Sequence, residues 1–148
     1  ELEAGLWFQD VVYDAKRSDN EEESARVAAA ALKDLGLAEE RVDRIARMIR
    51  ATRHNGSAQT KMEQLACDID LLSLAVPEAT FRRNTRLIRG EYGHLNDDDF
   101  RRGRAAFLEK MLGKGRTFYG EAFELQYGPA ATQNMRSAVE RLKGTGEW

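Results

Sequence analysis

The chain has 148 residues, enough for about one domain, and its 42% hydrophobic and 32% charged residues are typical of a globular protein. A formal net charge of −2 excludes a strong general attraction to nucleic acid or anionic membranes. Cys67 is the single cysteine, which excludes a disulfide framework and a cysteine zinc site. The most apolar stretch, residues 25–35, is too short and too charged to cross a bilayer. We therefore expect a soluble intracellular protein, in the cytoplasm or an organelle interior.

Apolar residues recur at helical spacing along the chain, and no segment shows the period of two that predicts a strand. The first predicted helix spans residues 2–13. A capping box, Ser18-x-x-Glu21, opens the second helix, and Gly36 ends it as a C-cap. The third helix runs to about His54.

The fourth predicted helix covers residues 61–76. Pro77 takes the first position of the fifth helix, whose apolar stripe extends to Leu95. Asn96 caps the sixth helix, which ends before Gly113.

The C-terminal part begins with a basic turn over residues 113–120. A seventh helix then covers residues 121–127 and breaks at Gly128-Pro129, because proline removes a backbone donor. The last helix covers about residues 130–142. Since the sequence has no internal repeat and no compositional boundary, we expect a single all-α domain, a compact multi-helix bundle over residues 1–148.

Two aspartates of the fourth helix fall on different helical faces. Asp68 shares an edge with Lys61 and Gln64, which predicts the solvent side. Asp70 has apolar neighbours such as Leu74, and a carboxylate in that setting needs a donor, a counter-charge or a metal. Either Asp70 accepts bonds from a neighbouring group, or it belongs to a site. We expect Asp70→Ala to cost more stability than Asp68→Ala.

The segment WFQDVVYD, residues 7–14, places two polar residues in an apolar run. Asp10 is aligned with Glu3 and Asp14, a stripe typical of a solvated helix edge. Gln9 lies about 100° away from that stripe, so solvation does not explain it as simply. A wet helix edge and a functional site both stay open as interpretations.

Other polar residues have ordinary structural explanations. His54 and His94 lie near helix ends, where the dipole favours a cation, although imidazole is also a common metal ligand. The arginines of residues 82–89 and 101–104 are candidates to meet phosphates or an acidic partner. The acids at residues 97–99 favour a mixed solvated surface instead.

Five segments together resemble one protein family in their order and spacing: WFQDVVYD, SDNEEESA, IRATRHN, CDIDLLSLAVP and IRGEYGHLNDDDFRRGRAAFL. The family is the predicted metal-dependent phosphohydrolases of the HD superfamily, which are small all-helical proteins. The resemblance runs from Leu6 to about Leu112. It implies an HD-domain-like fold in which a His-Asp pair, an earlier histidine and a later aspartate hold a divalent metal (Mn, Mg, Fe or Zn).

Matched residue by residue, the resemblance implies Asp10 and Asp70 as metal ligands, with Asp68 as the runner-up to Asp70. Gln9 stands where the family has the histidine of the pair, and is at most a weak ligand. Three further polar positions match groups around the metal or in contact with the substrate: Asn20, Glu21 and His54. Asn55 stands where the resemblance implies another histidine.

The ligand set is therefore reduced. The earlier histidine has no counterpart, and we expect the helix that carries it to precede Glu1. A glutamine oxygen is able to bind a hard cation such as Mg²⁺, but it is a poor replacement for imidazole with Mn²⁺, Fe²⁺ or Zn²⁺.

Two functions follow from the resemblance. In the first, the chain is a catalytically lapsed HD-phosphohydrolase-like domain, a structural or interaction subunit that binds other proteins and no metal. In the alternative, it is an active phosphohydrolase whose metal activates water against a small phosphoester or nucleotide. The missing imidazole ligands favour the first. Neither function implies membrane insertion or a nucleic-acid partner.

Overall fold

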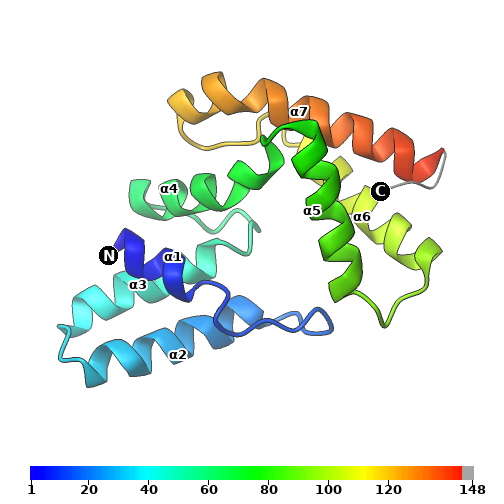
Figure 1. The fold of residues 1–148 in the computed structure, drawn as a ribbon. Coiled ribbons are helices and arrows are strands. Elements are labelled where there is room, and N and C mark those ends of the chain that lie inside the picture. The colour runs from blue at the N-terminus through cyan, green and yellow to red at the C-terminus, as the bar shows by residue number, and fades with distance from the viewer. Residues whose placement is uncertain (145–148) are drawn as a thin grey trace. The chain divides into compact units, whose positions relative to one another are not determined.

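The structure is a computed structural model that describes residues 1–144. Within these residues the fold is all-α, as the apolar periodicity predicts, with seven α-helices, one short 3₁₀ helix and no strand (Figure 1). The chain divides into two compact units, Glu1–Asp70 and Leu71–Trp148. No helix in the described part of the chain combines the length and the apolar character needed to cross a bilayer.

The first unit contains four helices: α1 (Leu2–Phe8), α2 (Asn20–Asp34), α3 (Glu39–Ala51) and α4 (Lys61–Asp70). α2 and α3 lie side by side, joined by a short turn in which Gly36 has a φ of 80° (Figure 1). Their facing apolar residues form the core of this unit: Ala25, Ala28, Leu32, Val42, Ile45, Ala46 and Ile49. α1 packs against α3 at Gly5, where a Cβ atom would lie 2.7 Å from the Met48 sulfur, so glycine permits this close approach.

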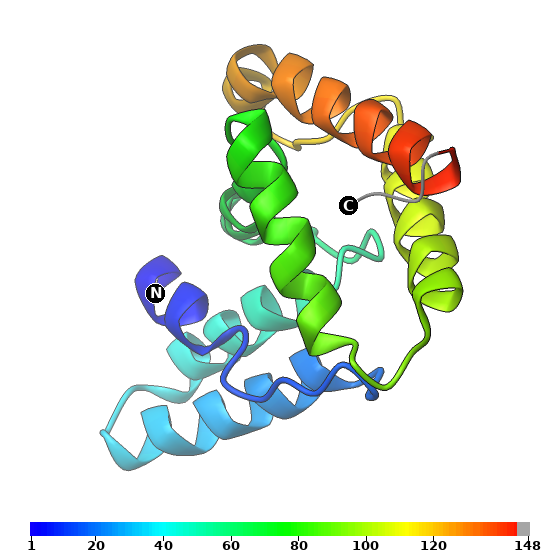
Figure 2. The same ribbon diagram turned by 45° about the vertical axis from the view of Figure 1, so that its right-hand side comes forward.

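The second unit contains the 3₁₀ helix η1 (Leu71–Leu74) and three α-helices: α5 (Glu78–Glu91), α6 (Asp97–Leu112) and α7 (Glu121–Lys143) (Figure 2). α6 and α7 pack together over a core that includes Leu108, Phe118 and Met135. The buried side chain of Asn134 donates to the carbonyl oxygens of Leu74 and Val76, at 2.9 and 2.8 Å, and so joins α7 to the end of η1.

Several predicted helix boundaries are wrong in the first unit. α1 ends at Phe8 and not at residue 13, because the chain then turns, with the Val11 amide donating to the Phe8 carbonyl. α2 begins at Asn20, and its N-cap is Asp19, so the capping box predicted at Ser18 does not form.

The predicted fourth helix is also shorter than expected. α4 ends at Asp70, and the chain continues as 3₁₀ helix over residues 71–74. Pro77 is the N-cap of α5 and not its first residue. Farther along, Asn96 caps α6 as predicted, with its side chain accepting a hydrogen bond from the Asp99 amide.

The break predicted at Gly128-Pro129 is wrong, because α7 continues through Pro129. The proline leaves the carbonyl of Leu125 without its helical donor. Pro129 and Leu125 are both exposed, so water is able to bond that carbonyl. The opposite face of α7 is held by buried residues such as Ala131 and Met135, which keeps the helix continuous.

Candidate functional site

Gln9, His54 and Asp70 meet in the first unit. Gln9 Nε2 donates to Asp70 Oδ1 at 3.0 Å, and His54 Nε2 lies 2.6 Å from Asp70 Oδ2. Each carboxylate oxygen therefore faces a nitrogen atom. The side chains of His54 and Asp70 are only 13% and 28% exposed, so this polar contact is shielded from solvent and gains strength from the low local dielectric.

The backbone at His54 is in an uncommon conformation. Its φ is 55°, in the left-handed region that side-chain-bearing residues seldom adopt. Gly56 follows with a φ of 88°, and Asn55 Oδ1 accepts a hydrogen bond from the Ser57 amide. This turn ends α3 and places the His54 ring on Asp70. Residues in such conformations persist only where surrounding contacts compensate for the strain.

A capping box fixes the other end of the loop that carries His54. Glu63 Oε2 accepts hydrogen bonds from the amides of Gln59 and Thr60, at 2.7 and 3.1 Å, and the Glu63 amide donates to Thr60 Oγ1. Arg47 lies 3.5 Å from the same carboxylate. Burial raises the pKa of Glu63, but these hydrogen bonds outweigh it, so the pKa lies below its ordinary value of 4.5.

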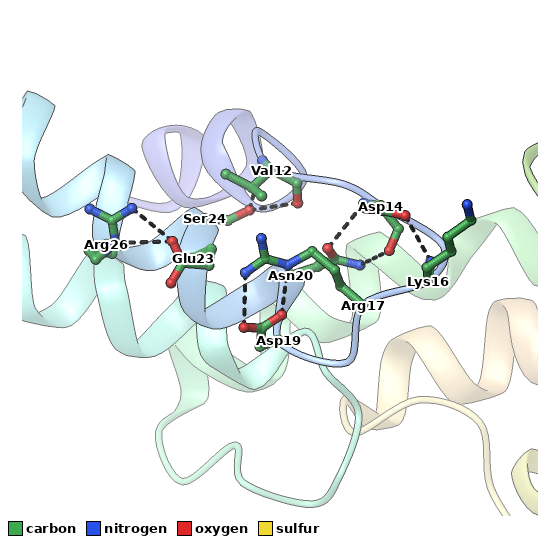
Figure 3. Close-up of polar contacts among 9 residues, drawn as sticks. All are labelled: Val12, Asp14, Lys16, Arg17, Asp19, Asn20, Glu23, Ser24 and Arg26. Carbon is green, nitrogen blue, oxygen red and sulfur yellow. Dashed lines mark hydrogen bonds and ion pairs between the residues drawn. The ribbon is translucent and has the colours of Figure 1, made fainter.

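Gln9 is held in place by the irregular segment that follows α1. The Val12 amide donates to Ser24 Oγ at 3.0 Å, and the Ser24 hydroxyl donates to the Val12 carbonyl at 3.2 Å. Asn20 bonds both the amide and the carbonyl of Asp14, at 3.0 and 2.9 Å. Figure 3 shows these side chains of α2 reaching up to the segment. The polar start of α2 thus anchors the chain beside Gln9.

The other residues implied by the resemblance lie as follows. Asp10 is exposed, and the residue of the 7–14 segment that bonds Asp70 is its neighbour Gln9. Asn20 holds the backbone of Asp14, as described above. Glu21 lies in the first turn of α2, where the helix dipole favours its charge.

The prediction that Asp68 faces solvent is wrong, because Asp68 is 1% exposed. The prediction used Lys61 and Gln64 as markers of the solvent side. Lys61 is exposed in the first turn of α4, but this exposure does not extend along the helix to Asp68. The capping box at Thr60-x-x-Glu63 was also missed, although its residue pattern is present in the sequence.

One polar atom of this cluster has no partner. Gln9 Oε1 is buried and accepts no hydrogen bond, because the amide nitrogen of the same group is the atom turned toward Asp70.

Across residues 1–144, no group of three or more His, Cys, Asp or Glu side chains is arranged to hold a metal ion. Comparisons with protein-family models, curated proteins and solved structures found no match to the chain.

Proposed function

We propose that the chain is a catalytically lapsed HD-phosphohydrolase-like domain that serves as a structural or interaction subunit. The observation that carries the proposal is the bonding of Asp70, whose two oxygens each face a side-chain nitrogen, one from Gln9 and one from His54. In this reading the carboxylate joins parts of the protein and does not hold a metal.

The donor set fits a divalent metal poorly. A ligating carboxylate directs a lone pair at the ion, whereas one lone pair on each Asp70 oxygen is directed at Gln9 or His54. Gln9 turns its amide nitrogen to Asp70, and that nitrogen is not a metal donor. The His54 nitrogen that faces Asp70 is engaged there as well. We therefore derive no catalytic step through a metal.

A structural role accounts for the same contacts. Gln9 follows α1, His54 follows α3, and Asp70 ends α4, so the cluster ties together three segments that are far apart in sequence. Hydrogen bonds that are shielded from solvent in this way hold the three segments together. The left-handed turn at His54 is compensated by the bond to Asp70.

An exposed apolar surface on α1 supports the interaction role. Trp7 is 79% exposed, and together with Leu2, Glu3 and Leu6 it lines a hollow of about 370 Å³. Exposed aromatic and aliphatic side chains that gather in this way are typical of protein-binding surfaces.

Calorimetric titration with Mn²⁺, followed by an assay with p-nitrophenyl phosphate, tests this proposal. We expect no tight binding and no metal-dependent hydrolysis by the unmodified chain. Gln9→His should produce measurable Mn²⁺ binding, because imidazole is a better donor for this ion. Gln59→His is the matched control, since it adds the same imidazole at an exposed position of the α3–α4 loop.

Tight binding and turnover by the unmodified chain would refute the lapsed-domain proposal and support the active phosphohydrolase. Binding that increases equally in Gln9→His and Gln59→His would mean that the added imidazole acts as a surface ligand. In that case, position 9 has no special relation to a metal.

A further inference from the structure

The second unit contains a cavity that the proposed function does not use. It has a volume of about 370 Å³, within the lower part of the range of roughly 300–1,000 Å³ typical of small-molecule sites. The end of α5, the connection after it and one face of α6 form its walls. Seven residues line it: Ile88, Tyr92, Leu95, Phe100, Gly103, Arg104 and Phe107.

The walls of this cavity are held in place without a ligand. The Arg89 guanidinium donates to the carbonyls of Tyr92 and Leu95, each at 3.0 Å, and also bonds Asp97. Its central carbon lies 5.3 Å from the ring centre of Phe100, a cation–π contact. The connection between α5 and α6 is therefore fixed, and the cavity is preformed.

Gly103 lines the cavity, and the fold itself does not require glycine there. It lies in the interior of α6, where glycine destabilises a helix relative to alanine. Its φ is not in the left-handed region, and a Cβ atom at this position would meet nothing within 4 Å. A helical glycine under open space allows a bound molecule to approach the backbone closely.

The chemistry of the lining selects the ligand. Most of the walls are aliphatic or aromatic, and among the described lining residues Arg104 alone carries a charge. The Arg104 guanidinium lies over the Phe107 ring, 5.2 Å from its centre, next to Gly103. A partly buried arginine in apolar walls is complementary to an anionic group attached to an apolar body.

We propose that this cavity binds a small amphipathic anion, with its apolar body against Ile88, Leu95 and Phe100 and its acidic group at Arg104. Because Gly103 has no side chain, the ligand is able to contact the backbone of α6 there. The site lies wholly in the second unit and does not depend on the function proposed for the first.

Fluorescence titration of the full chain with 1-anilinonaphthalene-8-sulfonate tests the site, and N-phenyl-1-naphthylamine serves as the matched neutral probe. We expect the sulfonate to bind more tightly than the neutral probe. Gly103→Leu should lower the affinity for both probes about tenfold or more, because the new side chain fills the cavity. Gly103→Ala should act in the same direction with a smaller loss.

The matched control is Gly90→Leu. Gly90 is also an exposed helical glycine with nothing within 4 Å of a Cβ atom, but it does not line this cavity. The Gly90→Leu substitution should leave the affinities for both probes unchanged. Thermal midpoints from circular dichroism should be no lower in Gly103→Leu and Gly103→Ala than in the unmodified chain, so that lost binding is not lost folding.

The role of Arg104 is tested with Arg104→Met and Arg104→Lys. Loss of the charge should lower sulfonate affinity about tenfold and leave neutral-probe affinity unchanged, since a hydrogen bond to a charged group contributes on this scale. Arg104→Lys should retain the preference for the anion. The proposal is overturned if the unmodified chain does not bind the sulfonate or if Gly103→Leu binds it equally well. It is also overturned if Gly90→Leu loses as much affinity, or if Arg104→Met keeps the preference.

Discussion

The two aspartates of α4 differ in their exposure and in their partners. Asp68 is 1% exposed, whereas the side chain of Asp70 is 28% exposed and bonds Gln9 and His54. The expectation that Asp70→Ala lowers stability more than Asp68→Ala depended on Asp68 facing solvent. Because Asp68 is buried, this reason no longer holds. Burial makes a carboxylate depend more strongly on its hydrogen bonds.

At the residue scale we predict that both substitutions are destabilising. Asp68→Ala and Asp70→Ala should each lower the free energy of unfolding by about 1–3 kcal/mol, since each leaves partner groups unsatisfied. The loss at Asp68 should be at least as large as that at Asp70. Urea denaturation of the two variants measures this. A loss below about 0.5 kcal/mol for Asp68→Ala would place that side chain among ordinary surface positions.

The sequence could predict that Asp70 needs a partner, but not which residues supply it. Gln9 is 61 positions away from Asp70 and His54 is 16 positions away, and helical periodicity does not determine contacts between segments. The sequence also did not predict the left-handed backbone conformation of His54, although the following Asn55-Gly56 pair is a turn signal. The cluster of Gln9, His54 and Asp70 can therefore be recognised only from the packing of the helices.

At the element scale, the cap of α4 links stability to pH. The pKa of Glu63 is lower in the folded state than its ordinary value of 4.5, so folding favours the ionised carboxylate. The stabilisation is fully present above that value and is lost as the pH falls through the lowered folded-state pKa. We predict that Glu63→Gln flattens this part of the acid-stability curve. Denaturation of both proteins over a series of acidic pH values measures it. Parallel curves would contradict the prediction.

A second element-scale prediction concerns the start of α7. Glu124 Oε2 accepts hydrogen bonds from the amides of Thr117 and Phe118, at 2.9 and 2.8 Å. A Cβ atom on Gly128 would lie 2.7 Å from the Glu124 carboxyl carbon. Gly128→Ala should therefore displace this carboxylate and lower the free energy of unfolding by about 1–3 kcal/mol.

The matched control for that prediction is Gly103→Ala. Gly103 is also a helical glycine, but open space lies above it, so alanine should stabilise α6 by up to about 1 kcal/mol. Opposite signs in urea denaturation would confirm that Gly128 makes room for Glu124. A gain in stability at both positions would mean that helix propensity outweighs the displaced contact.

At the scale of the whole molecule, periodicity predicts the all-α class but not the division into two units. The division falls between Asp70 and Leu71, inside the helix predicted over residues 61–76. Apolar residues continue across this point, so the change from α-helix to 3₁₀ helix leaves no mark in the pattern. The continuity of α7 through Pro129 was not predictable either, because it depends on which face of that helix is buried.

The central claim is that Asp70 is a structural acceptor and not a metal ligand. Thermal unfolding of the unmodified chain in EDTA and in excess Mn²⁺ tests it most directly, because a ligand that binds only the folded state stabilises that state. At a hundred times its dissociation constant, such a ligand adds about 2.7 kcal/mol, which raises the midpoint by several degrees. We predict the same midpoint in EDTA and in Mn²⁺, and a lower midpoint for Asp70→Asn in both. A midpoint that rises with Mn²⁺ in the unmodified chain, but not in Asp70→Asn, would contradict the claim.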